Sequence, residues 1–437
     1  MGHKSGEKVY RNLGKKIDAL QTRAPWSDAF CEIVKTLFTL EQADLVTKMP
    51  YGLASLDEIE KVTKYEKVKL QSILASLCSQ GLVMDLWIGD QYRYMPSPMV
   101  VGIFELVMMR TGDDLPSKRW AELFHQYMHG NDAFCEANFG RGKRVSVIRT
   151  LIHEEAVLPE EYIEVLDYER ATSIVDDADR FAIGLCSCRH EKLHVGQKEC
   201  NVPLEMCSSF GTVADLAIRN GFAKEVSKSQ MLEHLARSKE LKLVLTADNV
   251  KEKVNFMCHC CKCCCNLMLG VTKHGCPNTI VTSSFVSRVN RAKCKGCGKC
   301  ADICPVNAIE VVPSEDAPSG KKKTINIDKA ICIGCGVCGL ECSSDGIGLT
   351  KRRQDVIHPE TTFERVILQC LERGTLQNQM FANPQSLTHK FMRGFVGGFL
   401  RLPPIKRALM SDLLRSSFLA SIRMGIKMQG KGWLLEC

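Results

Sequence analysis

Two closely spaced cysteine runs constrain this chain of 437 residues more than any other feature. The first run, CKGCGKCADICP, covers residues 294–305, and the second, CIGCGVCGLEC, covers residues 332–342. Each run reads Cys-x2-Cys-x2-Cys-x3-Cys. Two residues between thiolates let a short loop curl around one corner of an iron–sulfur cube and reach three irons, so the fourth iron must be bound from elsewhere. The glycines between the cysteines allow positive φ and bring backbone N–H groups towards the sulfurs. These glycines are Gly296, Gly298, Gly334 and Gly336.

In these runs the sequence resembles the bacterial two-cluster ferredoxin domain, over roughly residues 286–350. In that family the fourth cysteine of each run crosses to the other cluster. The resemblance implies two [4Fe–4S] clusters, one held by Cys294, Cys297, Cys300 and Cys342 and the other by Cys332, Cys335, Cys338 and Cys304. A pair of zinc sites is the competing interpretation, but zinc ribbons use paired Cys-x2-Cys hooks and not a triple run with a remote fourth cysteine.

Two departures from the ferredoxin pattern stand out. Pro305 follows Cys304 as the family expects, whereas Cys342 is followed by Ser343, Ser344 and Asp345, which puts the usual cap of the first cluster in doubt. The stretch between Cys304 and Cys332 is long and includes the lysine run 321–323. It is predicted to form an extended hairpin at the surface.

The composition is that of an ordinary globular protein with room for several domains, apart from its 24 cysteines. The N-terminus (MGHKSGEKVYRNLGKK) has no apolar signal segment, and no stretch of about 18 apolar residues occurs. The cysteines are therefore expected to be intracellular metal ligands and not disulfides. So many oxidisable thiolates favour a reducing or anaerobic cytoplasm.

Residues 1–100 are predicted to form a winged-helix-like domain. Expected helices cover residues 26–40, 41–48 and 66–80, and a further helix opens at Ser55 with Glu58 completing a capping box. Two alternating apolar runs joined at Gly89 and Asp90 predict a hairpin wing. A winged helix invites a DNA-binding interpretation. However, this segment carries 13 Lys+Arg against 12 Asp+Glu, whereas a DNA reader concentrates positive charge, so a docking or structural role is favoured.

Residues 101–180 are expected to be a helical connector, and residues 181–285 a cysteine-rich iron–sulfur module. The module offers two candidate ligand sets: Cys186, Cys188, Cys200 and Cys207, and then Cys258, Cys261, Cys264 and Cys276. Cys260, Cys263 and Cys265 remain over. One or two further [4Fe–4S] clusters, a catalytic cluster with an open site, and zinc all remain possible occupants.

The polar neighbours of this module are ambiguous. His190, His194, His259 and His274 lie beside cysteines, but a histidine next to a metal loop more often hydrogen-bonds than coordinates. A spare thiol, His259 or His274 would serve a catalytic cluster. Arg189 is expected either to donate to a sulfur, raising the cluster potential, or to lie on the surface.

The Cys-x-Cys-Arg and Cys-x-Cys-Cys-x-Cys-Cys-Cys strings, set between a winged helix and a dicluster domain, resemble a family of multidomain iron–sulfur proteins of anaerobic microbes described as "4Fe-4S binding". The resemblance covers roughly residues 26–350. It implies electron transfer with an oxidoreductase partner and names no substrate.

Residues 351–437 form a basic tail with 14 Lys+Arg against 6 Asp+Glu, whereas residues 1–350 are neutral. Phe391, Phe395 and Phe399 recur at helical spacing, and a second helix-like segment follows Pro403 and Pro404. Such a segment folds back on its own protein, docks into a partner or lies on an anionic membrane surface.

The expected fold class is α+β multidomain, with a winged helix, a helical and cysteine-rich middle, a dicluster ferredoxin domain and a helical tail. The expected function is single-electron transfer to or from a partner oxidoreductase in the cytoplasm, with a peripheral membrane position as an option. No catalytic residue is identified and nucleic acid is not an expected partner. A redox-sensing DNA-binding regulator and a reductase with its catalytic cluster in residues 186–276 are the alternatives.

Overall fold

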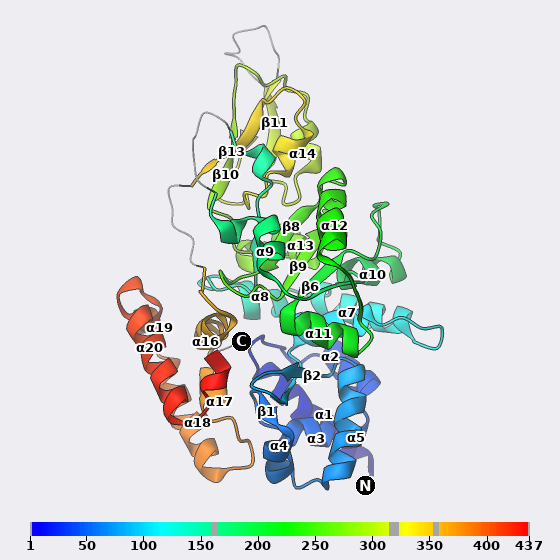
Figure 1. The fold of residues 1–437 in the computed structure, drawn as a ribbon, viewed down its shortest axis with the longest axis vertical. Helices are drawn as coiled ribbons and strands as arrows, with labels where there is room; N and C mark the ends of the chain where they lie inside the picture. Colours follow the sequence, from blue (N-terminus) through cyan, green and yellow to red (C-terminus); the bar gives the residue numbers. More distant parts are fainter. Residues whose placement is uncertain (1, 159–164, 314–322, 353–357, 436–437) are drawn as a thin grey trace. The chain divides into compact units, whose positions relative to one another are not determined.

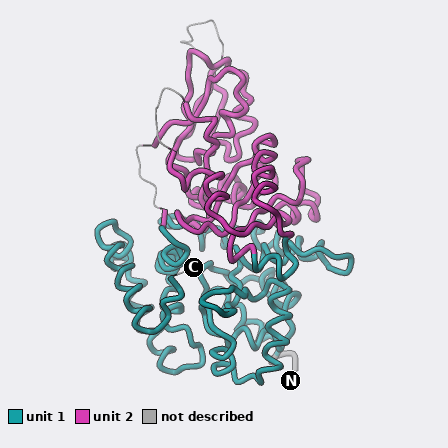
Figure 2. Tube along the Cα trace, in the orientation of Figure 1, with its two compact units in different colours: residues 1–145, 215–223, 360–437 teal, residues 146–214, 224–359 magenta. Residues whose placement is uncertain are grey.

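The computed structural model describes residues 2–158, 165–313, 323–352 and 358–435, with side chains from residue 6 onward. The chain divides into two compact units (Figure 2). Unit 1 contains residues 1–145, 215–223 and 360–437, and unit 2 contains residues 146–214 and 224–359. The cysteine-rich module and the dicluster segment therefore belong to one unit.

Unit 1 is mostly helical (Figure 1). Its N-terminal part contains α1 (Gly2–Asp18), α2 (Asp28–Leu37), α3 (Leu40–Lys48), β1 (Ala54–Ser55), α4 (Leu56–Thr63), α5 (Lys67–Ser79), β2 (Val83–Trp87) and β3 (Tyr92–Pro96). It continues with η1 (Met99–Ile103), α6 (Phe104–Met109), α7 (Ser117–His129) and α8 (Ala133–Phe139). The C-terminal part contains α16 (Thr362–Arg373), α17 (Leu376–Met380), α18 (Leu387–Leu400), α19 (Pro403–Met410), α20 (Asp412–Met428) and η5 (Gly432–Leu435).

The elements expected between residues 26 and 95 are present. The side chain of Ser55 accepts from the Glu58 backbone N–H and Glu58 reaches back to Ser55, which is the capping box that opens α4. The two expected wing strands pair as β2 and β3, and β1 adds to β3 to give the order β1-β3-β2. The assignment of these elements as a winged helix stays an interpretation. The sequence did not predict α1, which precedes them.

The basic tail folds back in part. Leu409, Phe418, Leu419 and Ile422 pack with α16 in one apolar cluster. In contrast, Leu387, Phe391, Phe395 and Phe399 recur every four residues along α18 and are 83, 70, 70 and 53% exposed. A row of apolar side chains on α18 thus remains uncovered. No helix among the described residues is both long and apolar enough to cross a membrane.

Unit 2 is built on a six-stranded sheet of order β4-β8-β9-β6-β5-β7. The strands are β4 (Ile148–Thr150), β5 (Phe181–Gly184), β6 (Cys207–Phe210), β7 (Ala223–Glu225), β8 (Val244–Asp248) and β9 (Phe256–Cys260). The connecting helices are η2 (Glu154–Ala156), η3 (Asp167–Glu169), α9 (Ala171–Asp177), α10 (Ser187–His194), α11 (Gly211–Arg219), α12 (Lys228–Glu240), α13 (Asn266–Thr272) and η4 (Pro277–Thr279). Residues 215–219 of α11 belong to unit 1. The sequence did not predict this sheet. Its strands are three to five residues long and short strands leave little periodic signal.

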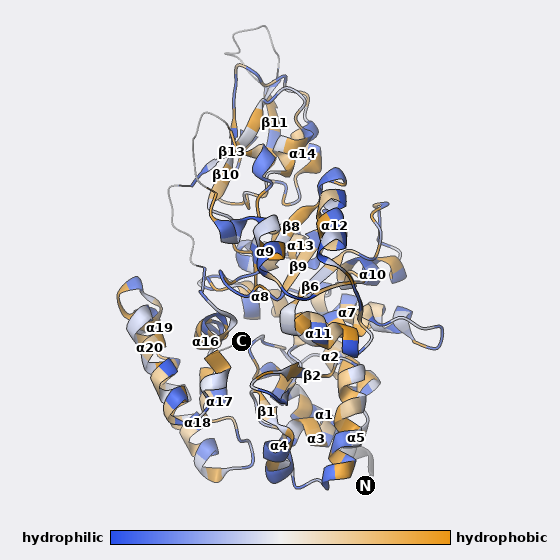
Figure 3. Ribbon diagram, viewed as in Figure 1, coloured by the Kyte–Doolittle hydropathy of each residue, from blue (hydrophilic) through white to orange (hydrophobic). Residues whose placement is uncertain are grey.

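One face of this sheet packs against α9 and α12, with Ile174, Met231, Leu235, Leu245 and Met257 in the core. Apolar residues run along β8 and β9 (Figure 3). Strands β5 and β9 both pair antiparallel with β6, so β5 and β9 run parallel and end at the same edge. The helices α10 and α13 begin just beyond that edge.

The dicluster segment consists of α14 (Lys299–Ile303), α15 (Val337–Glu341) and two antiparallel strand pairs. Strand β10 (Phe285–Val289) pairs with β13 (Ile347–Lys351), and β11 (Ile309–Pro313) pairs with β12 (Lys323–Ile327). The β11–β12 pair is the expected extended hairpin. Its tip, including Lys321 and Lys322, lies outside the described residues.

One buried carboxylate in unit 1 yields a stability test. Asp85 on β2 is 4% exposed and accepts a hydrogen bond from the Asn220 side chain at 3.0 Å. Arg219 forms an ion pair with its carboxylate and donates to its backbone carbonyl at 2.8 Å. The segment 215–223 is thereby fastened to the β2–β3 hairpin.

We expect Asp85→Ala to lower the free energy of unfolding of unit 1 by about 2 kcal/mol. The substitution leaves polar groups without their partner, and the partial exposure of Arg219 reduces the cost below that of a fully buried pair. Urea unfolding followed by tryptophan fluorescence measures it. The exposed Asp114→Ala is the matched control and should change stability by less than about 0.5 kcal/mol. Equal stability of the two variants would contradict the assignment.

Candidate metal centres

The first dicluster set brings together cysteines from both runs. Burial, together with the nearby thiols of Cys294, Cys297 and Cys342, raises the pKa of Cys300 to about 11. Cys342 comes from the second run, 42 or more residues away from the other three in sequence. The four thiols of the first expected ligand set therefore lie close to one another.

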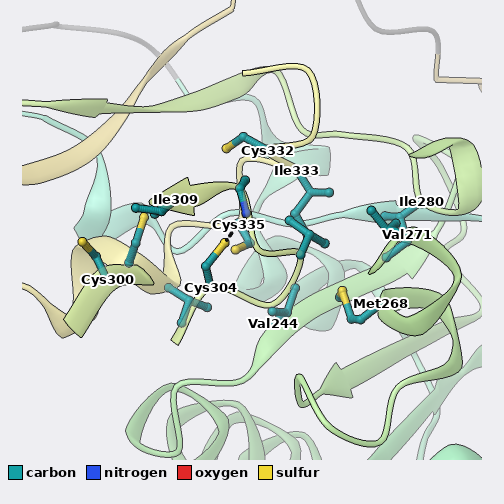
Figure 4. Packing of buried hydrophobic residues seen from close by; sticks show 14 of the residues in the cluster. Val244, Met268, Val271, Ile280, Cys300, Cys304, Ile309, Cys332, Ile333 and Cys335 are labelled. Carbon is teal, nitrogen blue, oxygen red and sulfur yellow. Dashed lines mark hydrogen bonds between the residues drawn. The ribbon is translucent and has the colours of Figure 1, made fainter. Parts of the chain in front are cut away.

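The second set shows the same exchange between the runs. Burial raises the pKa of Cys335, and the thiols of Cys338, Cys332 and Cys304 add to the effect. Burial also raises the pKa of Cys338 to about 12, with Cys332 and Cys304 again among the neighbours. Figure 4 shows Cys304 of the first run beside Cys335 of the second.

Positive φ in the loops makes this convergence possible. The four glycines between the cysteines, at positions 296, 298, 334 and 336, all have φ between 65° and 84°. A Cβ at Gly334 would lie 2.1 Å from the Phe285 carbonyl oxygen, so no other residue fits there without a shift of backbone. The expected role of these glycines is confirmed in geometry.

Hydrogen-bond donors point at the sulfurs of both sets. Backbone N–H groups of Gly296, Ala308 and Gly346 donate to Cys294, Cys304 and Cys342 Sγ at 3.4, 3.2 and 3.3 Å. Ser287 Oγ lies 3.2 Å from Cys338 Sγ. Donors of this kind stabilise negative charge on ligand sulfurs and tune the reduction potential of a cluster.

The departure after Cys342 also has a structural explanation. Ser344 Oγ lies 3.6 Å from Cys342 Sγ. Burial raises the pKa of Cys342, but hydrogen bonds from Ser344, Gly346 and Ile347 outweigh burial and lower it. The residues that replace the expected proline thus supply donors to the thiol.

The two sets differ in their access to water. All four cysteines of the second set are buried. In the first set Cys297 is exposed, and Cys294 and Cys342 are half-buried. One centre therefore lies inside unit 2 and the other reaches its surface.

Comparison with known proteins agrees with this geometry. Residues 293–345 match the family model of the 4Fe-4S dicluster domain. The chain is an iron–sulfur protein. No curated protein and no solved structure matches the chain. The match is limited to the dicluster segment, so the assignment of individual cysteines as ligands and the role of the remaining chain stay predictions.

The upstream cysteines assemble at the edge where β5 and β9 end. Cys207 opens β6 and lies directly opposite Cys258 on β9. Cys186 and Cys265 are the N-cap residues of α10 and α13. Six thiols from these segments form a continuous group, here called the six-thiol group: Cys186, Cys188, Cys207, Cys258, Cys260 and Cys265.

Contacts within the six-thiol group follow a path from thiol to thiol. Cys188 interacts with Cys186 and Cys265, and Cys260 interacts with Cys265 and Cys258. Hydrogen bonding to Cys207 and burial raise the pKa of Cys258 well above its usual value. Thiols so close together hold their protons until a metal displaces them.

A second set, here called the four-thiol group, contains Cys200, Cys261, Cys263 and Cys264. The four sulfurs lie within 4.8 Å of one another. This close grouping differs from the expected ligand sets, because it joins Cys200 to Cys261, Cys263 and Cys264. Cys186 packs in the same apolar cluster but is not one of the four close sulfurs. Cys276, at the N-terminal end of η4, is buried and is not among these four thiols.

Strand geometry explains the different grouping. Residues 256–260 form a strand, so Cys258 and Cys260 point to the same face of the sheet, whereas the intervening His259 points to the other. Cys261 lies beyond the strand end. The spacing Cys258-x2-Cys261-x2-Cys264 resembles a ligand loop in sequence, but the strand separates its first member from the other two. The alternation Cys258, Cys260 was the signal that could have revealed this.

His259 is a core residue with both ring nitrogens occupied. Its Nε2 lies 2.9 Å from Ser208 Oγ and its Nδ1 lies 2.7 Å from Ser238 Oγ. Burial lowers its pKa well below the usual value. The hypothesis that His259 serves an open catalytic cluster is therefore wrong.

Arg189 is fully buried, which excludes the surface alternative. Its guanidinium donates to the carbonyls of Pro203 and His259 at 3.1 and 2.7 Å. It also hydrogen-bonds the thiol of Cys261 and lies near Cys186 and Cys260. Burial lowers the pKa of Arg189, but the neighbouring thiols outweigh burial and raise it. A fixed positive charge thus lies between the two upstream thiol groups.

We expect Ser287→Ala to lower the reduction potential of the centre held by Cys304, Cys332, Cys335 and Cys338 by about 40 mV. In the unaltered protein the Ser287 hydroxyl stabilises the more negative, reduced state of the centre by about 1 kcal/mol. Because about 59 mV corresponds to a tenfold change in equilibrium for one electron, losing this energy lowers the potential by about 40 mV. A redox titration followed by electron paramagnetic resonance measures the shift.

Ser344→Ala is the matched control, because its hydroxyl lies near Cys342 of the other set. It should shift only the potential of the other centre. A shift of the same centre by both variants would contradict the separation of the two sets.

Proposed function

We propose that this protein transfers single electrons between partner oxidoreductases through two [4Fe–4S] clusters held by its dicluster segment. The observation that carries the proposal is the interleaving of the two cysteine runs into two thiol sets, within the segment that matches the 4Fe-4S dicluster domain. Such clusters supply one-electron chemistry when bound.

The contrast in burial fits a role in transfer. The set with Cys304, Cys332, Cys335 and Cys338 is enclosed by apolar residues such as Ile333, Val337 and Ile347. The set with Cys297 reaches the surface. A redox partner would exchange electrons at the exposed Cys297, while the buried set keeps water away from the charge.

Positive groups lie near these thiols, where they would offset the negative charge of thiolate ligands. Arg352 donates to the Cys332 carbonyl and lies close enough to the Cys332 thiol to interact with its charge. Lys262 lowers the pKa of Cys304, against the larger effect of burial. Its ammonium donates to the Asp302 carbonyl at 3.0 Å, which fixes it next to the first run.

We further propose that the six-thiol group holds an additional iron–sulfur cluster. Its Cys260 and Cys265 belong to the same buried core as Cys304, Cys332 and Cys335. Backbone N–H groups of Arg189, Asn266 and Met268 donate to Cys186, Cys188 and Cys265, as expected of cluster ligands. Lys262, between this group and the first run, makes the two sites neighbours. The extra centre would extend the electron path inward from the dicluster segment.

The exposed row on α18 supports a docking role for the tail. Its apolar side chains, at positions 387, 391, 395 and 399, lie in a segment of net positive charge. An oxidoreductase partner with an acidic, apolar groove is the occupant that this pattern favours.

We expect anaerobically purified protein to contain about twelve irons and twelve acid-labile sulfides per chain, four for each of three cubes. The double variant Cys258→Ser, Cys260→Ser should lose about four of each, because it removes two adjacent thiols of the six-thiol group, and should keep the dicluster signals. Iron and sulfide analysis with electron paramagnetic resonance measures both.

Cys31→Ser is the control, because Cys31 lies on α2 in unit 1. If the unaltered protein contains eight irons and the double variant contains the same number, the proposal of an additional cluster is wrong. If the cluster-loaded protein does not accept electrons from reduced viologen and pass them to an oxidised acceptor, the proposed electron-transfer function is wrong.

A further inference from the structure

The four-thiol group has the dimensions of a single-ion site. Cys200 Sγ lies 3.7 Å from Cys261 Sγ and 3.9 Å from Cys264 Sγ. Cys263 Sγ lies 3.9 and 3.4 Å from the same two sulfurs. A regular tetrahedron of thiolates around one zinc ion, with Zn–S of about 2.3 Å, has edges of about 3.8 Å. The observed separations scatter closely around that edge.

The dicluster sets provide a comparison within the same molecule. Among the described residues, neither dicluster set brings its four sulfurs within 4.8 Å of one another, whereas the four-thiol group does. Ligands of a cube are more widely spaced because each extends outward from a different iron. The four-thiol group is too tight to surround a cube.

We propose that Cys200, Cys261, Cys263 and Cys264 bind one zinc ion, distinct from the iron–sulfur centres of this protein. The site goes beyond the proposed electron transfer and does not depend on it. Tetrahedral coordination by four thiolates is the usual arrangement of a structural zinc site, and four protein ligands leave no position for substrate.

The surroundings suit a doubly negative zinc–tetrathiolate. The Cys261 thiol accepts hydrogen bonds from Cys264 and from the buried Arg189 guanidinium. Arg189 is itself anchored by the carbonyls of Pro203 and His259. Lys198 donates to the carbonyl of Cys200. Zinc ligands are typically oriented by such second contacts.

The position of the site explains what zinc would do. Cys200 lies in residues 197–206, which form neither helix nor strand. Its three partners lie in the turn between β9 and α13. Residues 197–206 connect α10, which carries Cys188, with β6, which begins at Cys207. A zinc ion would therefore fasten the irregular segment to the turn.

The test is metal analysis of the full chain, expressed with both iron and zinc supplied and purified without oxygen. We expect one zinc per chain in the unaltered protein. Cys200→Ser and Cys263→Ser should each reduce zinc to near zero and leave iron, sulfide and the electron paramagnetic resonance spectrum unchanged. The double variant Cys258→Ser, Cys260→Ser should show the reverse, losing iron and retaining zinc.

X-ray absorption at the zinc edge of the unaltered protein gives a measurement that does not depend on variants folding. We expect four sulfur neighbours at about 2.3 Å. The loss of about four irons in Cys200→Ser, a mononuclear iron signal in place of zinc, or nitrogen and oxygen neighbours at the zinc edge would each overturn the proposal.

Discussion

The structure of unit 2 depends on many cysteine thiols being buried next to one another, away from water. Burial and neighbouring sulfurs raise the pKa values of most of these cysteines, including Cys258, Cys300, Cys335 and Cys338. A raised pKa means that the folded chain without metal holds neutral thiols, and that a metal ion must displace their protons. Metal binding therefore becomes stronger as the pH rises towards those pKa values. A bound metal ion or cluster coordinates the crowded thiols and thereby cross-links the segments that carry them.

In the six-thiol group and in the dicluster segment, backbone N–H groups at the start of a helix point at cysteine sulfurs. Cys186 and Cys265 precede α10 and α13, and their thiols, with that of Cys188, accept backbone N–H groups at the start of these helices. In the dicluster segment the left-handed Gly298 and Gly336 begin α14 and α15. Both arrangements direct N–H donors at sulfur without using charged side chains. Arg189 and Lys262 then add the positive charge that backbone donors cannot supply.

Sequence reasoning was most successful where the determinants are local. The capping box of Ser55 and Glu58 and the β2–β3 hairpin were predicted because their signals lie within a few residues of the structure they specify. The six-stranded sheet was missed because its strands are short, and cysteine and histidine in β9 and serine in β6 carry weak strand preference. His259 and Arg189 were ambiguous in sequence, since only burial and hydrogen-bond partners distinguish a core residue from a ligand or a surface residue.

The sequence by itself indicated an iron–sulfur protein, because Cys-x2-Cys-x2-Cys spacing dictates the shape of one short loop. Its resemblance to two-cluster ferredoxins implied which eight cysteines of the dicluster segment converge. Only the tertiary structure decided how the upstream cysteines are distributed. Cys200 meets Cys261 across 61 residues, and Cys207 meets Cys258 through the register of β6 and β9. Such encounters depend on strand pairing and on which face a side chain occupies, and a shift of one residue in a strand would exchange the faces.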